Sequence, residues 1–135
     1  MISDDYLDWL SPALSEKIFT HRAPANIFVA QEAEEIVGFA VVGHGGEADM
    51  PPRSGELCGL YVRKQYQGQG LGRELFLKAE ERLRSLGYKR MFLWVLDRNL
   101  AAQRFYEHMD MRPDGGCKHA VLGTLVTENR MVKSL

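Results

Sequence analysis

The sequence predicts a single domain of the α/β (α+β) class, in which one sheet packs against helices. Three observations carry this prediction. The first half of the chain alternates short apolar runs with polar turns, which is typical of strands. A glycine-rich segment at 67–72 is followed by apolar residues at helical spacing, and the chain then continues as strand, helix and strand. Strands separated by helices predict a sheet that is locally parallel.

The expected elements follow in chain order. Residues 1–25 are expected to form short N-terminal helices, because their apolar residues are spaced for one or two helices broken near Pro12. Strands are expected at 27–30, 36–42 and 56–62, the first two joined as a hairpin by polar residues 32–35. Residues 43–54 contain several glycines and prolines and are expected to form a mobile loop.

Helical spacing begins at Gly70. The expected buried stripe consists of Leu71, Leu75, Ala79, Leu83 and Leu86. The pairs Glu74 with Lys78 and Glu80 with Arg84 are expected on the wet side of this helix, which ends at Gly87.

The remaining elements are a strand at 91–96 and a helix at 99–109 with Asn99 as its N-cap. A turn is expected at 113–116, and closing strands at 120–126 and 130–132.

Composition limits the function. The 135 residues suit one domain, and 45% hydrophobic with 26% charged residues is ordinary for a globular protein. The net charge of -1 gives no broad basic surface, so neither nucleic acid nor an acidic membrane is expected as a partner. No secretory or long apolar stretch occurs, which predicts a cytoplasmic protein.

Cysteine and histidine content predicts no metal site. Cys58 and Cys117 form neither a disulfide framework nor a ligand pattern, and Cys58 in its apolar run is expected to be a buried thiol. The four histidines have no ligand spacing, and His108 is expected to be exposed near a helix end.

The glycine-rich segment is expected to hold an anion. Its residues are Gln67, Gly68, Gln69, Gly70, Leu71 and Gly72. Backbone amides of such a loop, together with the first turn of the helix that follows, attract phosphate groups. Arg63, Lys64 and Arg73 add positive charge, so a pyrophosphate is the expected guest.

Three kinds of phosphate loop compete for this segment. A Walker loop needs Gly, four residues and then Gly-Lys-Ser/Thr, which the chain lacks. A dinucleotide fingerprint needs its third glycine where Arg73 stands. The pattern Gln/Arg-x-x-Gly-x-Gly/Ala, the coenzyme A loop of GNAT acetyltransferases, is matched by Gln67, Gly70 and Gly72. A glycine-rich turn without a ligand is the remaining alternative.

Two further segments resemble the GNAT superfamily in the expected order. Residues 55–62 resemble its fourth strand, and residues 99–107 resemble its motif Asn-x-x-Ala-x-x-Phe-Tyr-Glu. The resemblance covers 26–135, which it identifies as the cofactor-binding core. It implies a central mixed, mostly antiparallel sheet with a splayed parallel pair of strands and helices on both faces. The usual first strand and first helix of the family have no match in this chain.

The resemblance implies an N-acetyltransferase. Such an enzyme transfers an acetyl group from acetyl-coenzyme A to a primary amine of a small molecule or protein, by direct attack in a ternary complex. A coenzyme A-binding accessory module and a toxin-like acetyltransferase acting on aminoacyl-tRNA are the alternatives. A homodimer is expected, because absent N-terminal elements would leave apolar surface uncovered.

Roles for individual residues follow from the same resemblance. Backbone groups at Leu60, Tyr61 and Val62 are expected to bind the pantetheine arm of the cofactor. The loop 67–72 and Arg73 are expected to bind its pyrophosphate. Asn99, Ala102 and Tyr106 share one helical face toward the cofactor. Glu56 is the expected general base, or a strand-end carboxylate. Tyr106 is the expected general acid, or a core tyrosine.

Overall fold

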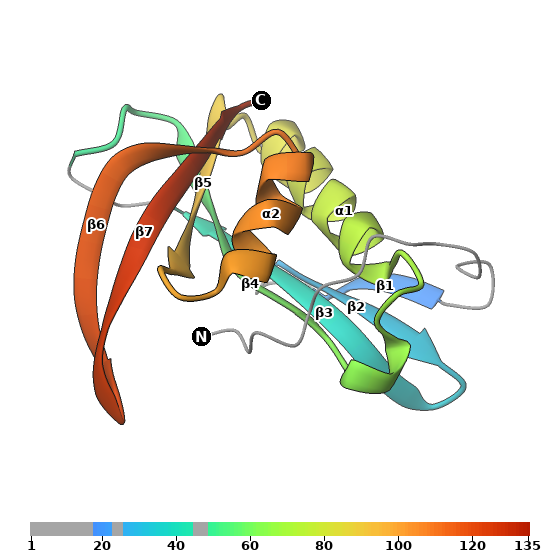
Figure 1. The fold of residues 1–135 in the computed structure, drawn as a ribbon. Helices are drawn as coiled ribbons and strands as arrows, with labels where there is room; N and C mark the ends of the chain where they lie inside the picture. Colours follow the sequence, from blue (N-terminus) through green and yellow to red (C-terminus); the bar gives the residue numbers. More distant parts are fainter. Residues whose placement is uncertain (1–17, 23–25, 45–48) are drawn as a thin grey trace.

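A computed structural model describes residues 18–22, 26–44 and 49–135, which form one mixed sheet and two α-helices (Figure 1). The strands are β1 (Ile18–Arg22), β2 (Ile27–Glu32), β3 (Glu35–His44), β4 (Ser54–Val62), β5 (Arg90–Leu96), β6 (Arg112–Leu122) and β7 (Thr124–Ser134). The helices are α1 (Leu71–Ser85) and α2 (Leu100–His108). The sheet order is β1-β2-β3-β4-β5-β7-β6. Only β4 and β5, among the described strands, pair in parallel, which confirms the predicted mostly antiparallel sheet.

Both described helices lie on the same face of the sheet. The ring of Phe76 in α1 contacts the rings of Phe105 and Tyr106 in α2, with centroids 6.2 and 6.3 Å apart. The sequence predicted helices on both faces of the sheet, and short N-terminal helices within 1–25. Residues 1–17 and 23–25 lie outside the described part, and Ile18–Arg22 is a strand, so the helix prediction is wrong there. This segment pairs antiparallel with β2, and its pairing overrides the helical spacing.

The core lies between α1, α2 and the centre of the sheet. Leu71, Leu75, Ala79 and Leu83 are fully buried, which confirms four positions of the predicted stripe. Leu86 is 44% exposed because the helix has already ended there, and its inclusion was wrong. No helix in the described part of the chain is long and apolar enough to cross a membrane.

Glu80 is buried, although the sequence placed it on the wet side of α1. Its carboxylate lies 3.0 Å from Arg84, as predicted, but also 2.9 Å from Lys133 Nζ of β7. Lys133 donates a further hydrogen bond to the Met109 carbonyl at the end of α2. One buried ion pair therefore joins both helices to the last strand.

The closing strands form a long hairpin that projects past the end of β5 (Figure 1). The predicted turn at 113–116 is a bulge within β6, where pairing jumps from Pro113–Met131 to Cys117–Asn129. The segment 120–126, predicted as one strand, turns at Gly123 and supplies parts of two strands. Local spacing could not distinguish a bulge from a turn, because both interrupt the pattern in the same way.

Packing of α1 on β4 predicts the effect of Gly55→Ala. An added Cβ at Gly55 would lie 2.7 Å from a Leu83 methyl group and 2.9 Å from the Tyr88 ring. Such overpacking typically lowers the free energy of unfolding by about 1–3 kcal/mol. Urea denaturation measures this loss, and the exposed Thr124→Ala is the control, expected to change stability by less than about 0.5 kcal/mol. Equal stability of both variants would contradict the packing described here.

Candidate functional site

The central feature of the site is the separation of β4 from β5. The two strands pair only through Ser54–Arg90, Gly55–Met91 and Glu56–Phe92. β4 and β5 continue beyond this point to Val62 and Leu96, and over that length β4 pairs only with β3 and β5 only with β7 among the described strands. The facing backbone edges of the two strands therefore diverge within the sheet. This confirms the predicted splayed parallel pair.

The predicted cofactor residues of β4 lie along this divergence. Leu60 and Val62 are fully buried toward the helices, and Tyr61 points to the opposite face, where its ring lies 5.6 Å from the Phe39 ring. The Val62 carbonyl accepts a hydrogen bond of 3.1 Å from Gln67 Nε2. The glycine loop is thereby fixed to the end of β4.

The loop adopts a conformation that requires glycine at two of its positions. Gly68 and Gly70 have φ angles of 80° and 82°, in the left-handed region that L side chains rarely adopt. Gly70 is the N-cap of α1 and, with no side chain, leaves the start of the helix without a side-chain cap. Leu71 and Gly72 then begin the helix and are buried, while Gln69 is partly exposed. This is the geometry of a backbone that can approach an anion at a helix N-terminus.

Charge around the loop is less positive than the sequence suggested. Arg63 lies 3.3 Å from Glu35 and is partly neutralised by it. Lys64 and Arg73 are exposed and form no ion pair with the described residues. Glu74 in the first turn of α1 is offset by Lys78 at 3.8 Å. Two cations thus remain beside the loop for a phosphate group.

The start of α2 confirms one role of Asn99. Its side-chain oxygen accepts a hydrogen bond of 3.0 Å from the Ala102 amide, so Asn99 is the N-cap. The amide nitrogen of the same side chain is not used in that bond. Ala102 and Tyr106 are buried on the face of α2 that packs toward the core, and Phe105 lies there too, as expected for a core residue.

Tyr106 is only 4% exposed and its ring packs against Phe76 and Phe105. It thus combines core packing with a position on the helix that Asn99 begins. The structure places Tyr106 on the helix-covered face of the sheet. Its role as an acid stays a prediction.

Glu56 lies at the last paired position of β4, where the strands begin to separate. Its partner Phe92 alternates along β5 with Met91 and Leu93, which pack into the helix-covered core. Neighbouring residues in register share a face of a sheet. Glu56 therefore points to the face opposite Tyr106, beside the divergence, and is partly exposed.

Cys58 is exposed, so its prediction as a buried thiol is wrong. The pairing of β3 with β4 jumps from Val42–Leu57 to Val41–Gly59, which leaves Cys58 as the extra residue of a bulge. A bulge reorients side chains relative to strand alternation, and no sequence pattern announced this one. Partial burial and the nearby Glu56 carboxylate raise the pKa of the Cys58 thiol to about 11.

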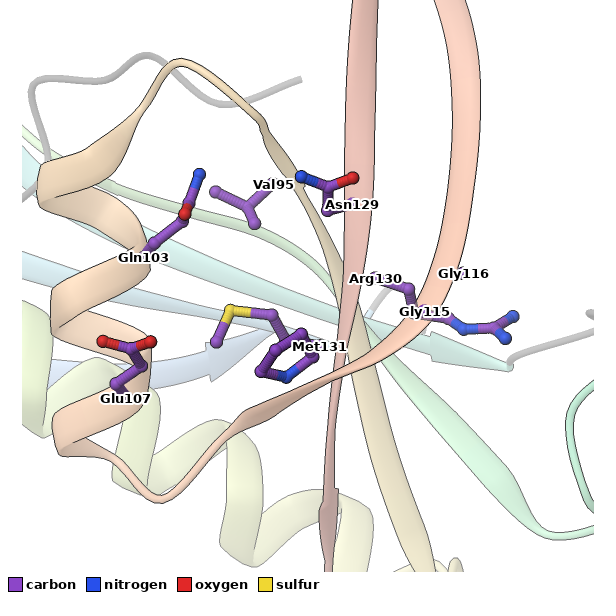
Figure 2. A pocket seen from close by; sticks show the side chains of 9 residues that line it. Val95, Gln103, Glu107, Gly115, Gly116, Asn129, Arg130 and Met131 are labelled. Carbon is purple, nitrogen blue, oxygen red and sulfur yellow. The ribbon is translucent and has the colours of Figure 1, made fainter.

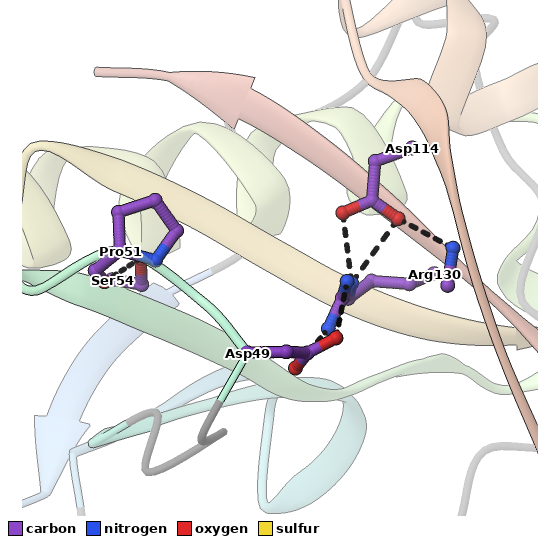
Figure 3. Close-up of polar contacts among 6 residues, drawn as sticks. Asp49, Pro51, Ser54, Asp114 and Arg130 are labelled. Carbon is purple, nitrogen blue, oxygen red and sulfur yellow. Dashed lines mark hydrogen bonds and ion pairs between the residues drawn. The ribbon is translucent and has the colours of Figure 1, made fainter.

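A buried arginine that sequence reasoning missed lies on the same face as Glu56 (Figure 3). Arg130 of β7 donates to both carboxylate oxygens of Asp49, at 2.9 and 3.0 Å, and through Nε to Asp114. These bonds lower the pKa of Asp49 and raise that of Arg130. The cluster ties the loop before β4 to the β6 bulge. The partners lie 81 and 16 residues away, so no local signal could have found it.

A pocket of about 280 Å³ lies between α2 and the β6 bulge (Figure 2). Gln103 and Glu107 of α2 and Asn129 and Met131 of β7 contribute to its lining. None of the predicted site residues lines it. Among the described residues, no group of three or more His, Cys, Asp or Glu side chains is placed to hold a metal ion.

Comparisons with known proteins agree with this geometry. A family model described as Acetyltransferase (GNAT) family matches residues 2–111. An uncharacterised N-acetyltransferase of Bacillus subtilis is 34% identical over 100 residues, covering 73% of this chain and 57% of the relative. A spermine/spermidine N(1)-acetyltransferase of that organism is 30% identical over 84 residues, covering 60% of this chain and 55% of the relative. The chain thus spans little more than half the length of these relatives.

Solved structures share the fold. An acetyltransferase of Salmonella typhimurium, solved with its cofactor acetyl-CoA, superposes with a TM-score of 0.68. The match has 23% sequence identity and covers 81% of this chain and 64% of the other. At this identity the likeness establishes the architecture.

The raised pKa of Cys58 predicts slow alkylation at neutral pH. In a Cys117→Ala background, the iodoacetamide rate should rise about tenfold per pH unit from 7 to 10, because only the thiolate reacts. Glu56→Gln should raise the rate at fixed pH by removing the nearby negative charge. Glu81→Gln, on the exposed side of α1, is the control and should change nothing. A rate that levels off below pH 9 would contradict the assignment.

Proposed function

Since this chain belongs to the GNAT acetyltransferase family, we propose that it transfers an acetyl group from acetyl-coenzyme A to a primary amine. Transfer occurs by direct attack of the amine within a ternary complex. The observation that carries the proposal is the divergence of β4 and β5 immediately beyond Glu56, next to a glycine loop at the start of α1.

The residues present fit coenzyme A. Strand edges that face each other without pairing can form hydrogen bonds with an extended pantetheine arm, and Leu60, Tyr61 and Val62 would supply them. The Gln67–Gly72 loop and Arg73 would hold the pyrophosphate, since Gly68 and Gly70 let the backbone approach closely. Asn99 and Ala102 would lie beside the pantetheine arm. When bound, acetyl-coenzyme A supplies a thioester whose acetyl group is open to attack by an amine.

Glu56 would serve as the general base. An alkylamine is protonated at neutral pH, its pKa being about 10.4, and must lose a proton before it attacks. Glu56 Oε1 or Oε2 could accept this proton, directly or through water. Its position on the face opposite the helices supports approach of the acceptor from that face.

Tyr106 would serve as the general acid on the other face. Its phenol hydroxyl would donate a proton to the departing thiolate sulfur. Acid and base on opposite faces suit a transfer in which the amine enters from one side of the sheet and the thiol leaves on the other.

The accessory-module alternative predicts coenzyme A binding without turnover. The toxin-like alternative requires a basic surface for tRNA, and the net charge of -1 does not favour it. An acetylation assay over a panel of amines separates these readings. The homodimer stays a prediction.

Cofactor binding predicts a rise in melting temperature with acetyl-coenzyme A, because a ligand of the native state stabilises it. Gly70→Asp should abolish the rise by placing a carboxylate where the pyrophosphate binds. Gly70→Asn is the matched control: both side chains tolerate the left-handed conformation, and Asn adds nearly equal bulk without charge. The shift should survive in part in Gly70→Asn. No shift in the unaltered protein, with blank calorimetry, would refute the cofactor.

Tyr106→Phe tests the general acid. General acid catalysis is typically worth about 10²–10⁴-fold, and thiols leave readily, so a loss near the lower end is expected in kcat and kcat/KM together. The dissociation constant of acetyl-coenzyme A should stay nearly unchanged, as should the melting temperature. Tyr88→Phe, which removes the hydroxyl of another partly buried tyrosine, is the control. A lower melting temperature with normal turnover would instead identify Tyr106 as a core residue.

A further inference from the structure

The pocket between α2 and the β6 bulge has no role in the proposed acetyl transfer. Its volume of about 280 Å³ is near the lower end of the range for ligand pockets, which is about 300–1,000 Å³. Val95 of β5 and Met131 of β7 line it, and both belong to the core on the helix-covered face of the sheet. The sheet therefore separates this pocket from Glu56, which points to the opposite face. A ligand in the pocket lies outside the path expected for the acceptor.

One wall of the pocket is a side of α2 (Figure 2). Gln103 and Glu107 are four residues apart and therefore neighbours on this side, whereas Tyr106 of the same helix belongs to the core. Gln103 Nε2 donates to the carbonyls of Leu96 and Asp97, at 3.0 and 3.1 Å. Both bonds use the amide nitrogen, so the amide oxygen is the group that Gln103 offers to a ligand.

Glu107 brings a negative charge to the same wall. Its side chain is exposed, and no Lys, Arg or His of the described residues lies within ion-pair distance of its carboxylate. The neighbouring Arg112 donates through Nη1 to the backbone carbonyls of Glu107 and Met111, at 3.1 and 2.7 Å, and not to this carboxylate. The carboxylate is therefore available to a cationic ligand.

The opposite wall is the bulge of β6, where pairing with β7 is interrupted. Gly115 and Gly116 present backbone to the pocket rather than side chains. An added Cβ at Gly116 would lie 2.7 Å from Arg130 Nε, so glycine at this position makes room for the guanidinium. The Arg130 side chain leads away from the pocket to Asp49 and Asp114 (Figure 2). Because two carboxylates bind it, Arg130 gives the pocket no net positive charge.

The chemistry of the lining specifies the ligand. Glu107 offers a carboxylate, and Gln103 and Asn129 offer amide oxygens, so hydrogen-bond acceptors and negative charge meet in one pocket. The rest of the side-chain lining is apolar and comes from Val95, Pro113 and Met131. Apolar walls with a few polar groups that fix orientation are typical of small-molecule sites.

We propose that this pocket binds a small organic ammonium ion with a compact apolar body, such as an arylalkylamine. The ammonium group donates to Glu107 and to the amide oxygens, and the apolar body packs against Val95 and Met131. This site goes beyond the proposed acetyl transfer and does not depend on it. An amine bound here is separated from Glu56 by the sheet, so it is held as a ligand and not as the acceptor.

The test titrates the full chain with benzylamine, an ammonium ion at neutral pH, and follows it by two-dimensional amide NMR. Progressive shifts are expected at the Gly115 and Gly116 amides and at the side-chain amide of Asn129. Benzyl alcohol has the same ring without the charge and should bind about 3- to 10-fold more weakly. Glu107→Gln keeps the shape of the side chain and should weaken benzylamine binding by a similar factor. Since Glu107 is exposed, the melting temperature should not change.

Glu81→Gln is the matched control, because it removes an equal charge from the exposed side of α1 and should leave the affinity unaltered. Equal affinity for benzyl alcohol, or unchanged affinity in Glu107→Gln, would overturn the inference. So would shifts confined to residues outside the pocket, or no shift at about 10 mM benzylamine, which would nearly saturate a site of millimolar affinity.

The outcome is independent of the proposed acetyl transfer. A protein that acetylates no amine but shows the expected shifts loses the proposed function and keeps this site. Acetylation without shifts in the pocket does the reverse.

Discussion

The separation of two parallel strands is the constraint on which this molecule depends. A parallel pair in a sheet normally satisfies its backbone groups along its whole length, yet β4 and β5 do so only up to Glu56 and Phe92. The bulge at Cys58 occurs just after this point, where β4 carries one more residue than β3, and such an insertion bends the strand that contains it. Backbone groups left unpaired along the facing edges of β4 and β5 destabilise the fold. Other contacts offset this loss, because β3 and β7 pair with the outer edges of the two strands and α1 and α2 cover one face of the gap. A guest that supplies the absent hydrogen bonds is the simplest reason to keep such an opening.

The two faces of the sheet have different chemistry. On the helix-covered face, Tyr106 is held by aromatic neighbours, and the Glu80–Lys133 pair fixes both helices to β7. The opposite face carries Glu56, Cys58 and the Arg130 cluster, which are polar and partly accessible. A rigid apolar support on one side and a polar surface on the other suit a reaction that needs one reactant bound tightly and another admitted from solvent.

Sequence alone predicted the features that depend on local chemistry. The glycines at 68 and 70, the Asn99 cap and the span of α1 follow from backbone conformation and helical spacing within a few residues. Features set by distant contacts were not predicted. Glu80 looked exposed because its burial comes from Lys133, more than fifty residues later, and Cys58 looked buried because the bulge breaks strand alternation. Ile18–Arg22 forms a strand because it pairs with β2, although the spacing of its apolar residues predicted a helix.

The buried charges of β7 show how the closing hairpin supports charged residues inside the sheet. Arg130 donates through Nε to Asp114 and through both terminal nitrogens to Asp49, and its guanidinium lies over the Trp94 ring. The bonds to Asp49 fix a loop from the other half of the chain to β7. Glu128, two residues earlier on the same face, is similarly buried, and its direct cross-strand partner on β6 is Lys118, a residue of opposite charge. Burying a charge is costly unless an opposite charge or a hydrogen bond compensates it. The register of β6 against β7 supplies an opposite charge at Glu128, and the β6 bulge supplies Asp114 at Arg130. The hairpin that closes the sheet therefore also places the acidic and basic residues that let β7 carry charges at buried positions.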